Sequence, residues 1–337
     1  MTNSVPYEEL DNICRTSVVI PVYRGETTLE PLVKEIAPLT HIQKTPEGNL
    51  FRVTEVVLVH DGAVDNSREV MQRLASHYPF VSLIWLSRNY GQHAATLAGM
   101  ASTDSEWVVT MDEDGQYDPC DIGKMLDKAI MSNVFLVYAH PINEPAHGWF
   151  RNRFSDLVKW IFVHIFGQQG IGHFNSFRLV QGDIARNLAA YCGSGIYLDV
   201  AFSWVVSRAE YCPVSVREDS SRPSGYNYRT LIGHFFRLIF TSSTKLLRLI
   251  SFLGLLSMLI AILISVYVLW MKVTSQISVP GWAFMIIVIC FFSGCTLLSL
   301  GIITEYIGAL LKMSMGKPLY LKVPGPGQKK GLVKNIE

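Results

Sequence analysis

The stretch "VVTMDEDGQYDP", residues 108–119, places a row of carboxylates directly after an apolar, strand-like run. The run ends at Asp112, Glu113 and Asp114, and Asp118 follows within the same stretch. Carboxylates this close together repel one another and raise one another's pKa unless a positive group lies among them. The stretch therefore predicts a buried strand that ends at a site in need of a positive partner.

The residues up to about 140 alternate between strand-like and helix-like segments. The strand-like runs are rich in β-branched residues and lie at 17–23, 55–62, 81–89, 106–114 and 134–140. Helix candidates lie between them, near 27–39, 65–77, 92–102 and 119–132. Continuous apolar strands are typical of a sheet covered on both faces, so the pattern predicts an α/β fold with a doubly wound, mostly parallel sheet.

Three of the predicted strands end in residues that can bind ligands. The first ends at Tyr23, the second at Asp61 and Gly62, and the fourth at the acidic cluster. Ligands of doubly wound sheets bind in the crevice beyond the carboxyl ends of the strands. We therefore expect these three strand ends to surround one site.

The acidic cluster has the spacing of a metal site. Asp112 and Asp114 occupy alternate positions at a strand end, so both side chains can point the same way. Two carboxylates suit Mg²⁺ or Mn²⁺, which prefer oxygen ligands and commonly bridge to substrate phosphates, and Gln116 could add a carbonyl oxygen. The alternative is a solvated acidic turn without a ligand.

Two other strand ends allow more than one interpretation. Asp61 can accept hydrogen bonds from a nucleotide base or ribose. The segment 88–91 opens a helix, where backbone amides favour phosphate, but Gly91 could equally provide a plain turn. Asp65 and Ser67 are best explained as caps of the next helix.

The C-terminal third has the composition of a membrane domain. Residues 249–271 and 282–304 lack charged side chains, and each run is long enough to cross a bilayer core of about 30 Å. The loop 272–281 between them carries one lysine, whereas Lys245, Arg248 and the basic tail 305–337 flank the outer ends. The positive-inside rule then predicts an integral membrane protein whose termini both face the cytoplasm. Two buried core helices are the alternative.

Two further segments combine an apolar face with basic residues. They are 148–167 and 227–248, the second of which runs directly into the first predicted span. Such helices can lie in a membrane interface, although a core-facing helix has the same pattern. We expect the interfacial arrangement for 227–248 and leave both open for 148–167. The polar N-terminus shows no signal peptide, and residues 1–226 are expected to form a cytoplasmic domain.

Charge and cysteine content exclude few classes of protein. The net charge is +1 over 337 residues, and the mean hydropathy of +0.25 is high for a soluble enzyme. The six cysteines show no C-x-x-C pair and no zinc-like spacing, which favours reduced thiols. No nucleic-acid partner is expected.

Four segments together carry a family resemblance. "VVIPVYRGE", "VLVHDGAVDNS", "LSRNYGQHAATLAGM" and "MDEDGQYDP" resemble the family 2 glycosyltransferases of the GT-A fold. The segment 280–321, from "PGWAF" to "KPLYL", resembles the membrane hairpin of polyprenyl-phosphate glycosyltransferases. That group includes dolichyl-phosphate mannose synthase and the bactoprenol glucosyl transferases. The resemblance extends from about residue 16 to residue 323.

The resemblance implies a role for each matching residue. The nucleotide sugar would be held by Pro21, Tyr23, Glu26, Asp61, Gly62, Asn89, Gly91 and Asp112. The metal would be bound by Asp112, Asp114 and Gln116. The acceptor phosphate would be contacted by Arg151, Ser155, Arg178, Arg217, Arg222 and Ser224. Together with Asp112 and Asp114, these four arginines are the candidate catalytic residues.

The sequence departs from the family pattern at three places. His60 and Ala63 stand where the family has an acid and a serine, and no acid occurs between Lys159 and Val180. A hydroxyl acceptor would need a general base, whereas a lipid phosphate arrives largely as a dianion because its second pKa is near 6. The missing acid therefore favours a phosphate acceptor, with basic residues and a metal bringing two anions together.

The resemblance thus predicts an inverting, metal-dependent transfer of sugar from a UDP or GDP sugar to undecaprenyl or dolichyl phosphate. It also suggests a homo-oligomer, with a tetramer as one form. A processive polysaccharide synthase is disfavoured because no Q-x-x-R-W motif is present. A non-catalytic, membrane-anchored protein that binds nucleotide sugars stays open, as does a different lipid or glycan acceptor.

Overall fold

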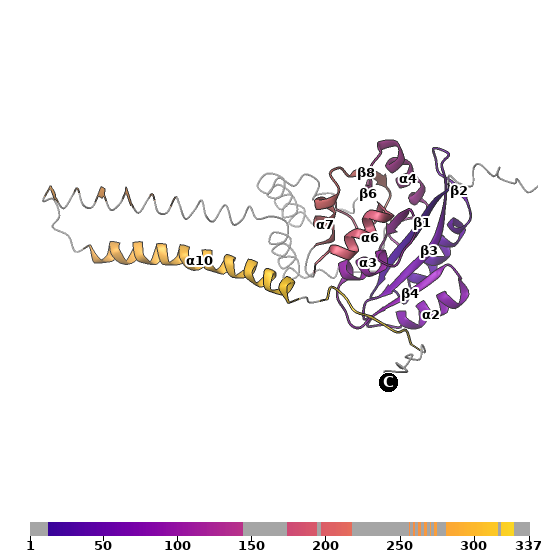
Figure 1. The fold of residues 1–337 in the computed structure, drawn as a ribbon, viewed down its shortest axis with the longest axis horizontal. Coiled ribbons are helices and arrows are strands. Elements are labelled where there is room, and N and C mark those ends of the chain that lie inside the picture. The colour runs from indigo at the N-terminus through magenta and orange to yellow at the C-terminus, as the bar shows by residue number, and fades with distance from the viewer. Residues whose placement is uncertain are drawn as a thin grey trace, which may run out of the picture. The chain divides into compact units, whose positions relative to one another are not determined.

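The computed structural model describes residues 13–143, 174–193, 197–217, 281–315 and 318–326, with isolated positions between 256 and 274. Two units are distinguished by their internal contacts. The described residues before 218 and after 317 belong to the first unit, and 281–315 belong to the second. Figure 1 shows the strands and helices of each unit.

The first unit is built on one nine-stranded sheet. Its strands are β1 (Cys14–Val22), β2 (Gln43–Lys44), β3 (Leu50–His60), β4 (Val81–Leu86), β5 (Trp107–Thr110), β6 (Leu136–Pro141), β7 (Arg178–Gln181), β8 (Glu210–Val214) and β9 (Lys322–Val323). They lie in the order β8-β6-β7-β5-β1-β3-β4-β9, and β2 pairs with β3. All five predicted strands are present.

The sheet has the predicted parallel strands at its centre, and antiparallel strands make it mixed. The central strands β5, β1, β3 and β4 are parallel neighbours, as predicted. However, β7 runs antiparallel to both β5 and β6 and separates them, and β9 is antiparallel to β4. β7 and β9 are four and two residues long, too short to give a clear period-two pattern in the sequence.

Helices cover both faces of the sheet. They are α1 (Leu29–Ile36), the 3₁₀ helix η2 (Ala37–Thr40), α2 (Ser67–His77), α3 (Gln92–Met100), α4 (Asp121–Ser132), α6 (Gly182–Tyr191) and α7 (Leu198–Val205). One apolar cluster joins the sheet to α1, α2 and α4, and a second joins it to α3, α6 and α7. β1 contributes Val18 and Ile20 to the first cluster and Val19 to the second. Burial on both faces explains why this strand is continuously apolar.

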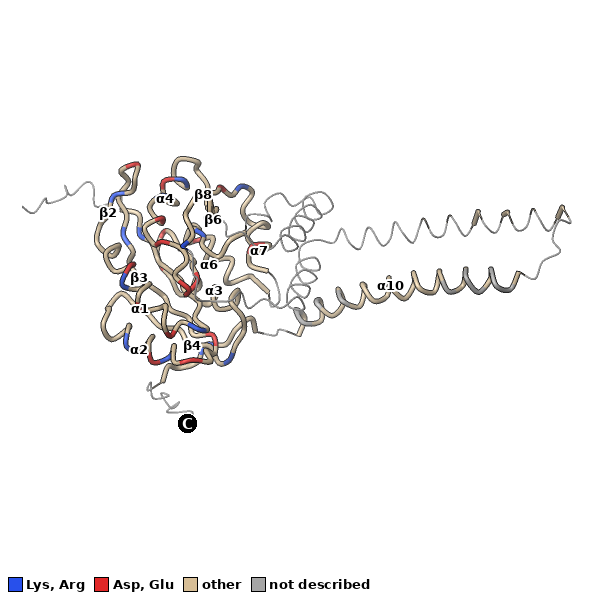
Figure 2. Tube along the Cα trace, turned by 180° about the vertical axis from the view of Figure 1, so that it is seen from behind, with Lys and Arg blue, Asp and Glu red and all other residues tan. Residues whose placement is uncertain are grey.

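The second unit contains the apolar helix α10 (Trp282–Ser314). Its window Phe291–Gly308 has a mean hydropathy of 1.3 and satisfies the length and composition of a membrane span, alone among the described residues. Its sequence has two charged residues, Glu305 and Lys312, both toward its C-terminal end, whereas charged residues are spread over the first unit (Figure 2). The helix continues to Ser314, whereas the predicted span stops at Thr304. The predicted segments 148–167, 227–248 and 249–271 lie outside the described residues, apart from isolated positions of the last.

Residues 318–326 return to the first unit after α10. We call them the C-terminal strap. Within it, β9 pairs with β4, so that Val323 lies opposite Trp85 and Lys322 opposite Leu86. This return is not predicted from the sequence, in which the segment is only part of a basic tail.

Candidate active site

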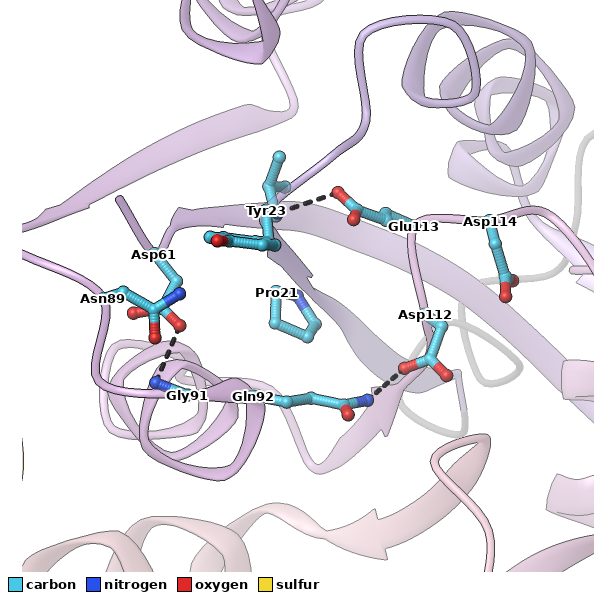
Figure 3. A pocket seen from close by; sticks show the side chains of 10 residues that line it. Pro21, Tyr23, Asp61, Asn89, Gly91, Gln92, Asp112, Glu113 and Asp114 are labelled. Atoms are coloured by element: carbon cyan, nitrogen blue, oxygen red, sulfur yellow. Dashed lines mark hydrogen bonds between the residues drawn. The ribbon is translucent and has the colours of Figure 1, made fainter. Parts of the chain in front are cut away.

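A cavity of about 310 Å³ lies at the carboxyl ends of β1, β3 and β5, beside the N-terminus of α3. Its lining residues are Pro21, Val22, Tyr23, Asp61, Asn89, Gly91, Gln92, Asp112, Glu113 and Asp114. Figure 3 shows that they come from segments far apart in the sequence. The three strand ends that the sequence singles out therefore meet at one site, as expected for an open α/β sheet.

Asp112 is held in place by two side chains. Its carboxylate accepts one hydrogen bond from Gln92 and another, of 2.7 Å, from the Ser176 hydroxyl. Figure 3 shows the Asp112 side chain pointing toward Gln92 across the cavity. Burial and the neighbouring Asp114 together raise the pKa of Asp112 to about 6. A cation at this position would relieve the repulsion between the two carboxylates.

Asp114 lies at the start of a tight turn. Its carboxylate accepts a hydrogen bond of 3.1 Å from the backbone amide of Gln116, and Gly115 between them has a φ of 71°. Gln116 does not line the cavity, and its backbone carbonyl accepts a bond from Arg217. The structure thus brings Asp112 and Asp114 to the cavity and leaves Gln116 behind, because the turn carries the chain away from it.

Two carboxylates are too few to hold a metal ion alone. Among the described residues, no group of three or more His, Cys, Asp or Glu side chains has the arrangement of a metal site. The donor set nevertheless fits Mg²⁺ or Mn²⁺, since both ions prefer oxygen and often take further ligands from substrate phosphates and water. Asp112 and Asp114 would be the protein ligands of such an ion.

Glu113 lines the same cavity but has a different function in the fold. Its two carboxylate oxygens accept hydrogen bonds from the backbone amides of Tyr23 and Arg24, at 2.9 and 2.8 Å. These bonds tie the loop after β1 to the loop after β5 (Figure 3). Glu113 therefore fixes the wall that carries Tyr23, and the sequence did not predict this contact.

Asp61 uses both carboxylate oxygens to hold the loop before α3. They accept hydrogen bonds from the backbone amides of Tyr90 and Gly91, at 2.7 and 2.8 Å. Asp61 is 3% exposed, and burial raises the pKa of its carboxyl group. An aspartate thus sits where a helix N-terminus could otherwise receive a phosphate. The turn interpretation of Gly91, with its φ of 93°, agrees with this geometry.

Gly62 and Asn89 complete that wall of the cavity. Gly62 has a φ of 65°, and a Cβ there would lie 2.7 Å from the backbone nitrogen of Asn89. Only glycine allows the two loops to approach this closely. Asn89 itself lines the cavity and is exposed, so its side chain is available to a ligand.

Glu26 is not brought to the cavity. Its carboxylate accepts hydrogen bonds from the backbone and side-chain amides of Asn66, at 3.3 and 2.8 Å. The Asn66 partner lies just before α2, so Glu26 braces the start of that helix. Asp65 accepts a hydrogen bond of 3.1 Å from the backbone amide of Ser67, as a capping side chain does. Ser67 itself is the first residue of α2, and Asn66 rather than either predicted residue occupies the N-cap position.

Arg178 is a core residue rather than a surface one. It is 4% exposed and forms an ion pair with Asp199, which is 3% exposed and also accepts a bond from the Tyr138 hydroxyl. Its guanidinium lowers the pKa of Asp112 by its charge, against the larger effect of burial. The structure therefore does not present Arg178 to an acceptor phosphate, because a buried aspartate already neutralises it.

Arg217 is likewise occupied by carboxylates. Its guanidinium lies 2.8 Å from Glu35 and 3.0 Å from Asp118, and its backbone amide donates to Gln116. It thus fastens the acidic loop to α1. The other predicted acceptor residues, Arg151, Ser155, Arg222 and Ser224, lie outside the described residues.

Gln92 and Ser176 are site residues that sequence reasoning missed. Both hold Asp112, and Gln92 also lines the cavity. Gln92 is the first residue of α3, directly after Gly91, so its position at a helix start beyond a strand could have indicated it. Ser176 precedes β7, which the sequence did not reveal.

Comparisons with known proteins point to one enzyme family. Residues 17–183 match the model of glycosyl transferase family 2. An undecaprenyl-phosphate 4-deoxy-4-formamido-L-arabinose transferase of Salmonella choleraesuis (strain SC-B67) is 27% identical over 317 residues, or 91% of this chain and 92% of that protein.

Two of the similar solved structures come from mycobacteria. Glucosyl-3-phosphoglycerate synthase from Mycobacterium tuberculosis, in complex with Mn²⁺, UDP-glucose and phosphoglyceric acid, has a TM-score of 0.49 at 17% identity, covering 69% of this chain and 79% of that one. Another mycobacterial protein has a TM-score of 0.50 at 18% identity, covering 69% and 74%. At these identities the likeness concerns the fold alone. The family match, together with the mixed α/β sheet and the acidic cavity at its strand ends, identifies residues 17–183 as a glycosyl transferase family 2 domain.

Proposed function

We propose that this glycosyltransferase moves a sugar from a nucleotide-diphosphate sugar to a polyprenyl phosphate at a membrane. The observation that carries the proposal is the pair Asp112 and Asp114 at the end of β5, facing a cavity beside the start of α3. The same acids would bind a metal–diphosphate, and the adjoining polar wall would bind the nucleoside. Mg²⁺ and Mn²⁺ fit the donor set equally well.

The donor would lie across the cavity with its diphosphate near the acidic loop. The bound metal would supply positive charge that stabilises the departing nucleoside diphosphate. Gln92 and Ser176 keep the Asp112 carboxylate oriented. Glu113 holds the loop that carries Tyr23 in place beside the cavity. Asn89 and the backbone near Pro21 are available to the nucleoside. UDP and GDP remain equal candidates for this position.

The acceptor is proposed to be a lipid phosphate because its nucleophilic oxygen needs no general base. That oxygen would bond to the anomeric carbon as the bond to the diphosphate breaks, with inversion at that carbon. The similar Salmonella proteins are named for transfer to undecaprenyl phosphate, which supports a lipid acceptor here. Arg151, Arg222, Ser155 and Ser224 remain proposed acceptor contacts, whereas Arg178 and Arg217 are better explained as structural cations.

The proposed membrane topology gains support from the C-terminal strap. Because β9 pairs with β4, the residues before 218 and after 317 belong to one folded unit and must share one side of the membrane. If α10 crosses the bilayer, the chain must therefore cross an even number of times. The predicted span 249–271 would provide the second crossing, and the positive-inside rule places the shared side in the cytoplasm.

A donor panel tests the function directly. The full-length chain is incubated with radiolabelled UDP and GDP sugars, polyprenyl phosphate and Mn²⁺ or Mg²⁺, and the lipid is extracted with organic solvent. We expect label in the lipid from at least one donor, and none when EDTA removes the metal. Metal-dependent nucleotide binding without transfer from any donor would instead favour the non-catalytic binding protein.

A further inference from the structure

The C-terminal strap contacts the first unit along β4 and the loop after it. The backbone carbonyl of Leu321 accepts a hydrogen bond of 2.9 Å from the Ser87 amide, one residue beyond β4. The Lys322 ammonium donates to the Ser102 hydroxyl at 2.7 Å, just after α3. Burial lowers the pKa of Lys322, in keeping with this packed position. Figure 1 shows the strap beside β4, in yellow.

One chain of contacts leads from the strap to the donor cavity through Ser87. The Ser87 hydroxyl lies 2.9 Å from the Tyr90 hydroxyl, and the backbone amide of Tyr90 donates to Asp61. The Tyr90 ring packs on the same apolar cluster as Leu319 and Tyr320 of the strap. Residues 87–91, which include the cavity residues Asn89 and Gly91, are thus held by the strap on one side and by Asp61 on the other.

A second chain of contacts runs through Trp85. A Cβ at Gly325 would lie 2.6 Å from the indole nitrogen of Trp85. The strap therefore packs so closely on this ring that only glycine fits at position 325. Trp85 also contacts His60, with 4.9 Å between the ring centroids. His60 directly precedes Asp61. Both routes therefore end at the residues that form one wall of the cavity.

We propose that the C-terminal strap is a positioning element of the donor site, holding residues 87–91 in the conformation that receives the nucleotide. The inference rests on the proposed function, since it assumes that this cavity binds the donor. The strap follows the apolar helix α10 in the chain. During synthesis, the donor site is therefore completed only after α10 has been made. The role of the strap is to position the loop, because no strap residue lines the cavity.

Two substitutions separate the strap from β4 in the full-length chain. Gly325→Val places side-chain atoms against Trp85, and Val323→Pro removes a backbone donor from the strand paired with β4. Leu321→Gln is the matched control, because its side chain is half exposed while its carbonyl is left in place. Affinity for UDP and for GDP, each with Mn²⁺, is measured by calorimetry, and donor and acceptor kinetics are measured in the same preparations.

We expect Gly325→Val and Val323→Pro to raise the nucleotide Kd and the donor KM about tenfold, with kcat and the acceptor KM within about twofold of wild type. Leu321→Gln should match wild type. Hydrogen exchange at residues 87–91 should become faster in the two variants only. A strap with a merely stabilising role would lower the amount of active enzyme without raising the donor KM.

The outcomes separate this inference from the proposed function. Faster exchange in the strap itself, with unchanged exchange at 87–91 and unchanged nucleotide Kd, would overturn the positioning role. If wild type bound neither UDP nor GDP, the proposed function would fail, and the donor-positioning role would fall with it even if exchange at 87–91 responded. If one variant failed to fold, Lys322→Ala, which removes the bond to Ser102 and the cation–π contact with Tyr320, provides a milder test with the same expected direction.

Discussion

Asp112 carries an electrostatic cost that a bound cation would remove. Its pKa of about 6 lies above the ordinary 3.8 because of burial and the nearby Asp114. The sequence identified both aspartates from their spacing after an apolar run. It could not show that Arg178 is neutralised, because Arg178 lies in β7 and Asp199 in α7, and only the tertiary fold brings the two together.

We predict that Asp112→Asn stabilises the metal-free protein at neutral pH. The folded state holds the proton up to about pH 6 and the unfolded state only up to about 3.8, so stability from this group is lost as pH rises through 6. Asparagine cannot ionise and can still bond to Gln92 and Ser176. The variant should gain up to about 3 kcal/mol at about pH 7.5 and only about 1 kcal/mol near pH 4.5.

Thermal unfolding in EDTA at the two pH values checks this prediction, with Asp118→Asn as a control on the same loop. An equal shift of Tm at both pH values would show that Asp112 does not titrate in this range. If Asp112 is a metal ligand, added Mn²⁺ should raise the Tm of wild type but not that of Asp112→Asn, so that wild type becomes the more stable of the two.

At the scale of elements, the central strands and their helices follow from the sequence because burial on both sheet faces makes each strand a continuous apolar run. How a helix packs on its strand depends on close contacts between side chains, which the periodicity of the sequence does not reveal. Gly99 of α3 is one such contact, since a Cβ there would collide with the Val19 side chain of β1. β7 and β9 were missed because their length leaves no periodic signal.

We predict that Gly99→Ala destabilises the first unit by about 1–3 kcal/mol, because the added methyl group overpacks the interface between α3 and β1. Val19→Ala removes the atoms in collision, so the double variant should recover part of the lost stability. Thermal unfolding of the two single variants and the double variant checks this. If the stability lost by the double variant equalled the sum of the losses of the two single variants, the two residues would not be in contact.

At the scale of the whole molecule, composition and charge predicted an apolar C-terminal domain, and α10 is long and apolar enough to agree. The same data could not predict that the chain returns as the strap, because pairing with a sheet edge depends on backbone hydrogen bonds rather than on side-chain pattern. The return makes the sheet unit discontinuous in sequence and places both flanks of the apolar region in one fold.

We predict that residues 282–314 insert into a membrane when placed in a translocation reporter. Leu298→Arg lies near the middle of the most apolar window and should oppose insertion by about 2.5–3.5 kcal/mol. Ser314→Arg, at the end of the helix, should have little effect because a terminal cation can reach the interface. Equal insertion of the two variants would contradict a spanning role for α10.

The proposed function requires the acidic pair after β5 to support metal-dependent transfer to a lipid phosphate. The most direct measurement compares wild type, Asp114→Asn and Asp118→Asn for transfer of radiolabelled sugar from the active nucleotide sugar into extractable lipid, in membranes with equal amounts of inserted protein. We predict that Asp114→Asn abolishes transfer while Asp118→Asn, on the same loop but paired with Arg217, retains most of it. Near-normal transfer by Asp114→Asn would contradict the metal assignment and the proposed function with it.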